Sequence, residues 1–191
     1  MSRFQKIFDP VQGELSLPPV TIDEPAFSIL LNMTGAVTSW ATATKAVNPD
    51  VRFQVVRVLH SLKKLARIGK VDPVLLEGAV ANILRDNSGY CRSTGLNGEK
   101  ESDFFGDLFR VADYVGGVQT HDSLVSDFFL ALGDFIRELQ TRIAFDLMKE
   151  NEGLVELVRI KLAKLVFAWA KIAVRLDMTA DEVFEIVEPS E

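Results

Sequence analysis

Three long segments of the chain place apolar side chains at helical spacing and contain no proline. They span residues 51–68, 124–149 and 154–176. One side of the second segment carries, in order, Phe128, Leu132, Phe135, Leu139 and Ile143. Apolar residues that recur every three to four positions share one side of an α-helix. The pattern therefore predicts three long amphipathic helices, and the apolar residues of the third nearly surround it, which favours a central position.

Local start and stop signals predict further helices between and beyond these segments. Asp72 is a typical N-cap residue, and Pro73 suits the first turn of the helix that follows. The additional predicted helices cover residues 25–45, 73–84, 103–114 and a segment that opens on the capping box Thr179-Ala-Asp-Glu182. The stretch 86–100 contains three glycines and predicts a long loop. No segment predicts a β-strand, so we expect an all-α bundle of six to eight helices.

The first 25 residues contain four prolines and only scattered apolar side chains. Proline removes a backbone hydrogen-bond donor and interrupts helices and central strands. We therefore predict an irregular, extended arm over residues 1–25. The remaining residues, 26–191, have a length that suits one helical domain.

Two parts of the chain align with each other without a gap. Residues 51–80 match residues 158–187, and the predicted helix break and the following N-cap coincide in the two halves. Five of the thirty aligned positions are identical, which is compatible with an internal duplication and also with chance similarity between amphipathic helices. A duplication would give repeat halves over 26–85 and 124–191, joined by a loop and a short helix.

The two aligned hairpins contain the sequences LARIGKVDPVLLEGAV and IAVRLDMTADEVFEIV. They resemble the C-terminal hairpin of the all-α MazG-like nucleotide pyrophosphatases. That family holds magnesium with Glu-x-x-Glu and Glu-x-x-Asp pairs, since magnesium requires hard oxygen ligands. The matching positions here are Gln54 and Arg57, Lys161 and Lys164, Gly35 and Thr38, and Asp134 and Arg137. The resemblance thus implies nucleotide binding without a metal and without hydrolysis.

Positive charge is concentrated in two segments of an otherwise acidic chain. The whole sequence has 21 basic and 27 acidic residues, a net charge of −6. Residues 51–70 contain six basic residues and residues 158–176 contain five, and neither segment contains an acid. From Asp177 onward the chain has six acids and no basic residue. We expect this acidic C-terminus to recruit a protein partner.

The first of these segments predicts a basic helix face that includes an aromatic ring. On a helix, its basic residues and His60 fall on one side, and Phe53 and Val56 fall among them. Cations that hold phosphates beside a ring that stacks on a base are typical of single-stranded nucleic-acid binding. The predicted contact residues are Arg52, Phe53, Arg57, Lys63, Lys64, Arg67 and Lys70, with Tyr90 and Arg92 from the long loop. Alternatively, the cations pair with acids on neighbouring helices and Phe53 packs under another helix.

No pattern indicates an enzyme, a metal or a cofactor. His60 and His121 lie far apart, and Cys91 is the single cysteine, so neither a disulfide framework nor a four-cysteine zinc site can form within the chain. We expect no membrane-spanning segment and a cytoplasmic location. The apolar cluster Phe104, Phe105, Leu108 and Phe109 predicts a homo-oligomer.

Three functions remain open at this point. The first is non-enzymatic binding of single-stranded DNA or RNA. The second is nucleotide binding without hydrolysis by a diverged MazG-like protein. The third is a helical scaffold or adaptor without a nucleic-acid role.

Overall fold

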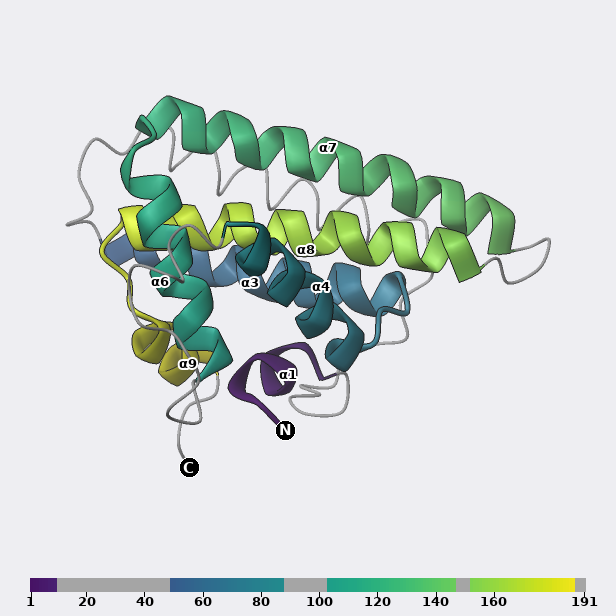
Figure 1. The fold of residues 1–191 in the computed structure, drawn as a ribbon, viewed down its shortest axis with the longest axis horizontal. Helices are drawn as coiled ribbons and strands as arrows, with labels where there is room; N and C mark the ends of the chain where they lie inside the picture. Colours follow the sequence, from purple (N-terminus) through teal and green to yellow (C-terminus); the bar gives the residue numbers. More distant parts are fainter. Residues whose placement is uncertain (10–48, 88–102, 147–151, 188–191) are drawn as a thin grey trace.

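The computed structural model describes residues 1–9, 49–87, 103–146 and 152–187 and contains seven helices in these ranges (Figure 1). They are α1 (Arg3–Phe8), α3 (Pro49–Ile68), α4 (Pro73–Asp86), α6 (Phe104–Gly117), α7 (His121–Asp146), α8 (Glu152–Arg175) and α9 (Ala180–Val187). The described ranges contain no strand. The predicted all-α bundle of six to eight helices is therefore confirmed. The predicted helix over 25–45 lies outside the described residues.

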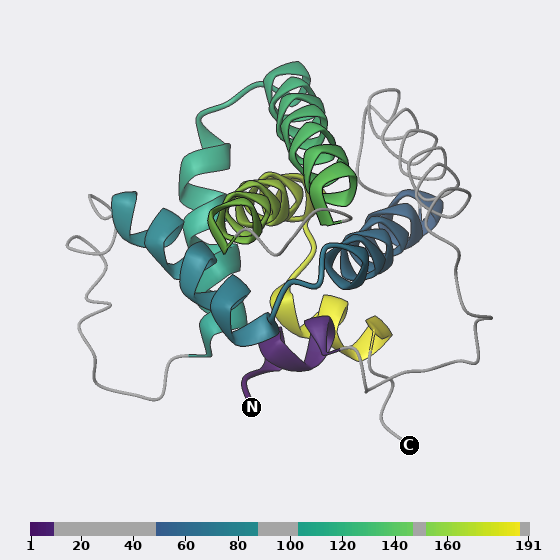
Figure 2. The ribbon, with the colours of Figure 1, turned by 90° about the vertical axis from the view of Figure 1, so that its right-hand side faces the viewer.

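Helix α8 lies at the centre of the bundle and packs against α3, α4, α6 and α7 (Figure 2). Its side chains from Leu165 to Ala173 are all buried, as the sequence predicted for a helix with apolar residues on nearly all sides. Trp169 is fully buried, and its indole Nε1 donates to the carbonyl oxygen of Val55 at 3.0 Å. This bond gives the buried indole a partner and ties α8 to α3.

The predicted irregular arm is wrong for its first residues, because residues 3–8 form helix α1. Ser2 caps this helix, and its side chain and that of Gln5 form a reciprocal capping box. Phe4, Ile7 and Phe8 are buried, and α1 packs against α3, α4, α6 and α9. The four prolines that suggested an arm all come later in the chain. Residues 10–25 lie outside the described residues.

Two turns, α3–α4 and α8–α9, share one hydrogen-bond pattern. The N–H of Val71 donates to the oxygen of Ala66, and the N–H of Met178 donates to the oxygen of Ala173, both in the 6→1 spacing that closes a helix. The residue before each donor, Lys70 or Asp177, has a positive φ, of 48° and 54°. These positions coincide in the internal alignment, so the aligned sequences form the same turn. The duplication itself stays a prediction.

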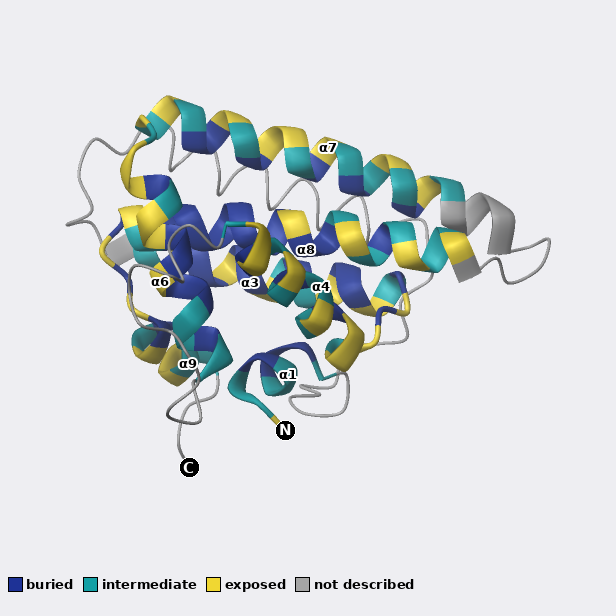
Figure 3. Ribbon diagram, in the orientation of Figure 1, coloured by how far each residue is buried: buried dark blue, intermediate teal, exposed yellow. Residues whose placement is uncertain are grey.

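The apolar cluster that suggested an oligomer lies inside one chain. Phe105, Leu108 and Phe109 are buried, and the ring of Phe104 meets that of Phe4 edge-on at 5.3 Å. Burial is general along the inner side of the bundle, whereas α7 turns an exposed side to solvent (Figure 3). The cluster therefore completes the core of one chain, and the oligomeric state stays a prediction.

Candidate nucleic-acid interface

Helix α3 has a buried side and an exposed side, and the exposed side carries the predicted ring and cations. The buried side includes Val55, Leu59 and Leu62, which face the other helices of the bundle. The exposed side carries Phe53, Arg57, His60, Lys64 and Arg67, which follow one another at steps of three or four residues. We call these five residues the α3 stripe. At 1.5 Å per residue the stripe is about 21 Å long.

Phe53 lies at one end of the stripe with 58% of its surface exposed. The alternative prediction, in which this ring packs under another helix, is therefore wrong. Val56 differs, because it is 2% exposed and belongs to the core. Its predicted place on the basic face is wrong. Helical spacing gives the angle of a residue on α3, but the packing of the folded chain determines which angles are buried.

Arg57 and Lys64 are two basic residues of the stripe that are accessible to a ligand. Both are exposed, and neither forms an ion pair within the described part of the chain. Arg67 continues the line and is also exposed. Lys63 is half-buried beside the stripe, and Lys70 is exposed in the α3–α4 turn. The predicted residues Tyr90 and Arg92 lie outside the described residues.

His60 lies between Arg57 and Lys64 on the stripe. Partial burial, and then the neighbouring ammonium groups of Lys63 and Lys64, lower the pKa of His60 below its ordinary value of 6.5. The imidazole is therefore neutral at pH 7. The stripe at neutral pH thus consists of three cations, a neutral imidazole and an exposed aromatic ring.

Arg52 is engaged by the C-terminal part of the chain. Its guanidinium donates to the carbonyl oxygen of Asp177 at 2.8 Å and lies 3.5 Å from a carboxylate oxygen of Glu182. The backbone N–H of Thr179, and then Arg52, help to lower the pKa of Glu182, so this carboxylate is ionised at neutral pH. Arg52 therefore holds α9 against α3, and its charge is compensated within the protein.

The basic residues of α8 are mostly compensated as well. Lys161 lies 2.8 Å from Asp134, and Lys171 lies 2.9 Å from Asp127. Arg159 pairs with Glu156, and Arg175 donates to the carbonyl oxygen of Gln119. The alternative in which cations pair with acids on neighbouring helices therefore holds for Lys161 and Lys171, which reach acids of α7, whereas Arg159 pairs within α8 and Arg175 bonds a backbone oxygen. The two basic segments thus differ, and the open cations of α3 are the better candidates for binding.

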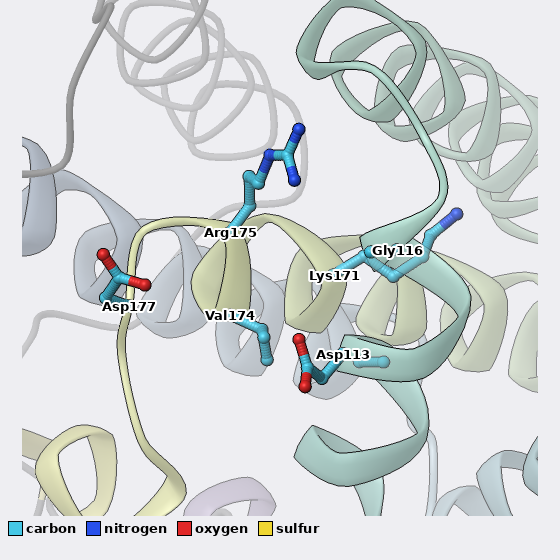
Figure 4. Close-up of a pocket in the computed structure, with 8 residues that line it drawn as sticks. Asp113, Gly116, Lys171, Val174, Arg175 and Asp177 are labelled. Atoms are coloured by element: carbon cyan, nitrogen blue, oxygen red, sulfur yellow. The ribbon is translucent and has the colours of Figure 1, made fainter.

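A polar cavity of about 310 Å³ lies between the end of α6, α8 and the α8–α9 turn, and no residue of the stripe lines it. Its lining includes Asp113, Gly116, Lys171, Arg175 and Asp177. Figure 4 shows the side chain of Asp113 directed toward Val174, whereas Lys171 and Arg175 extend away from it. Within the described residues no three His, Cys, Asp or Glu side chains are placed to hold a metal ion. Sequence patterns contained no signal for this cavity, which forms only in the tertiary structure.

Comparisons with known proteins do not indicate a function. No protein-family model matches the chain, and searches of curated proteins and of solved structures found no match. None of the described helices is both long and apolar enough to cross a membrane.

Proposed function

We propose that this protein binds single-stranded nucleic acid through the α3 stripe, without catalysing a reaction. One observation carries the proposal: the exposed ring of Phe53 lies in line with Arg57 and Lys64, which have no ion-pair partner within the described residues. Most α8 cations, in contrast, form ion pairs.

The chemistry of the stripe suits a strand better than a compact ligand. Cations attract the phosphates through a local field that acts despite a net charge of −6. An exposed aromatic ring offers a base a stacking surface worth about 1–3 kcal/mol. A stripe of about 21 Å is long enough to contact several successive phosphates of a single strand. Nothing along this line selects one base, so we expect little sequence preference.

A single triphosphate, the ligand that the MazG-like resemblance implies, is the second candidate. A triphosphate is compact and requires cations that converge on one point. The cations of the stripe are instead spread along the helix, since Arg57 and Arg67 lie ten residues, or about 15 Å, apart. The geometry therefore favours an extended polyanion over a nucleotide. The proposed location is the cytoplasm, and the acidic α9 region is the proposed contact for a protein partner.

Fluorescence anisotropy with a labelled oligonucleotide tests the proposal. Lys64→Ala should weaken binding to all sequences and reduce the salt slope by about 0.7. Lys164→Ala, which removes an exposed cation from α8, is the matched control and should have little effect.

A second pair of variants tests the ring. Phe53→Ala should weaken binding about 5- to 150-fold, which corresponds to about 1–3 kcal/mol. Phe129→Ala removes a partly exposed ring from α7 and should leave affinity unchanged. Equal effects of Phe53→Ala and Phe129→Ala would exclude stacking on Phe53. Thermal stabilisation by a nucleoside triphosphate without oligonucleotide binding would favour the second candidate.

A further inference from the structure

The two ends of the α3 stripe have different electrostatic surroundings. Beyond Phe53, toward the N-terminal end of α3, lies α9, which packs against this end (Figure 1). The contact is made by Arg52, the neighbour of Phe53, which binds the backbone of Asp177 and the carboxylate of Glu182. From Phe53 in the other direction, α3 and the turn after it carry cations and no acid until Asp72, the N-cap of α4.

The α9 side keeps a surplus of negative charge after its internal pairs are counted. Glu182 is compensated by Arg52, and Asp181 pairs with Arg3. The side chains of Asp177 and Glu185 are exposed, and no ion pair to either is formed within the described residues. Two carboxylates of the described residues therefore keep their charge without an ion pair, one on the α8–α9 turn and one on α9, the two parts of the chain that contact Arg52 beside the ring.

These surroundings restrict how a strand can lie on the stripe. Phosphates that follow the cations from Arg67 to Arg57 reach the ring of Phe53. A strand that continued past the ring would bring its next phosphates toward the α9 carboxylates. At 0.1 M ionic strength the field of exposed charges extends about 10 Å, so those carboxylates would repel a phosphate placed there. A terminal base that stacks on the ring requires no phosphate at that place.

We infer that the α3 stripe binds the end of a single strand, with the terminal base on Phe53 and the chain of phosphates running from Arg57 toward Arg67. This inference rests on the proposed function. The preferred terminus ends in a hydroxyl group, since a terminal phosphate would face α9. The acidic C-terminal helix thereby distinguishes a strand end from the interior of a strand.

The experiment compares a linear oligonucleotide with its covalently closed circle of the same sequence, both labelled at an internal base. At about 0.1 M salt the linear form should bind at least about tenfold more tightly than the circle. Oligonucleotides that carry a 5′ or a 3′ phosphate identify the bound terminus, because one of these phosphates should weaken binding.

The variant Asp177→Asn/Glu185→Gln tests the cause. It removes both exposed carboxylates, and asparagine tolerates the positive φ at position 177. The circle should then bind almost as well as the linear strand. The control Asp86→Asn/Asp122→Asn changes the net charge equally at exposed positions in α4 and α7 and should preserve the preference.

Three outcomes would count against these ideas in different ways. Equal binding of circle and linear strand by the wild-type protein would overturn the inference and leave the proposed function intact. An unchanged preference in the Asp177→Asn/Glu185→Gln variant would also overturn it, because α9 would then not be its cause. Absence of binding to both forms at low salt would refute the proposed function itself.

Discussion

The ion pair between Lys171 and Asp127 should respond very differently to the removal of each partner. The side chain of Lys171 is 8% exposed, and its ammonium group donates to Asp127 and to Gln119, each at 2.9 Å. The side chain of Asp127 is 38% exposed and can be hydrated without its partner. Removal of the acid therefore leaves a buried charge, whereas removal of the lysine leaves a solvated one.

The magnitudes follow from this asymmetry. Asp127→Ala should lower the free energy of unfolding by about 3–5 kcal/mol, the cost of a buried charge without its counter-ion. Lys171→Met keeps the aliphatic length and removes two charge-assisted hydrogen bonds. Because Asp127 regains water and keeps its bond from the Gln119 amide at 2.8 Å, we expect a loss of about 1–2 kcal/mol. The double variant should also lose about 1–2 kcal/mol, well below the sum of the two.

Urea unfolding of the four proteins at pH 7 measures these differences, provided that the m-value stays constant. The pH dependence supplies a second measurement. Partial burial raises the pKa of Asp127, but hydrogen bonds from Lys171 and Gln119 lower it more, so the net shift is downward. A lowered carboxylate pKa stabilises the fold above about pH 4 and loses this effect as the pH falls. Lys171→Met should therefore lose less stability than wild type between pH 5 and 3. A larger loss from Lys171→Met than from Asp127→Ala would refute this account.

Three further predictions concern α1 and the stripe. Phe4→Ala should cost about 3–5 kcal/mol in urea unfolding, because the ring is fully buried; a loss below about 1 kcal/mol would mean that α1 does not complete the core. Phe53→Ala should change the free energy of unfolding by less than about 0.5 kcal/mol, and a larger loss would place this ring in the core. Because the pKa of folded His60 is lowered, the unfolded chain binds the proton more readily, so stability should fall as the pH drops below about 6.5. Urea midpoints at pH 7.5 and 5.5 should differ less in His60→Gln than in wild type, and equal differences would contradict the lowered pKa.

The parts of the fold that depend on local signals could be predicted from the sequence. Periodicity marked α7 and α8, and the N-cap Asp72 and the capping box at Thr179 marked the starts of α4 and α9. The capping box Ser2–Gln5 was an equally local signal for α1. It was missed because α1 has six residues and the prolines that follow it suggested an arm.

The parts that depend on tertiary packing could not be predicted in the same way. The angular pattern places Val56 among the cations of the basic face, whereas packing in the folded chain buries it. Lys171 aligns with Lys64 in the internal alignment. Lys64 is exposed, whereas Lys171 is buried and forms an ion pair with Asp127 of α7. Helical spacing places Arg52 on the basic face, but its guanidinium contacts Glu182 of α9, which lies 130 residues later in the chain.

The candidate site shows the same division. Spacing along one helix was sufficient to group Phe53, Arg57 and Lys64, because residues on one helix keep fixed angles to each other. The acidic neighbour at one end of the stripe depends on the path of the chain after α8. The effect that we infer for it on a bound strand could therefore be proposed only from the fold.

The salt dependence of oligonucleotide binding tests the central claim most directly. Three phosphate contacts, from Arg57, Lys64 and Arg67, predict that log K falls with log salt concentration at a slope of about −2, at about 0.7 per contact. Anisotropy titrations of the wild-type protein with a labelled strand between about 20 and 200 mM salt should give this slope. Lys64→Ala should reduce it to about −1.4. A protein without measurable affinity at 20 mM salt, or a slope that Lys64→Ala leaves unchanged, would contradict the claim that the α3 stripe binds the phosphates.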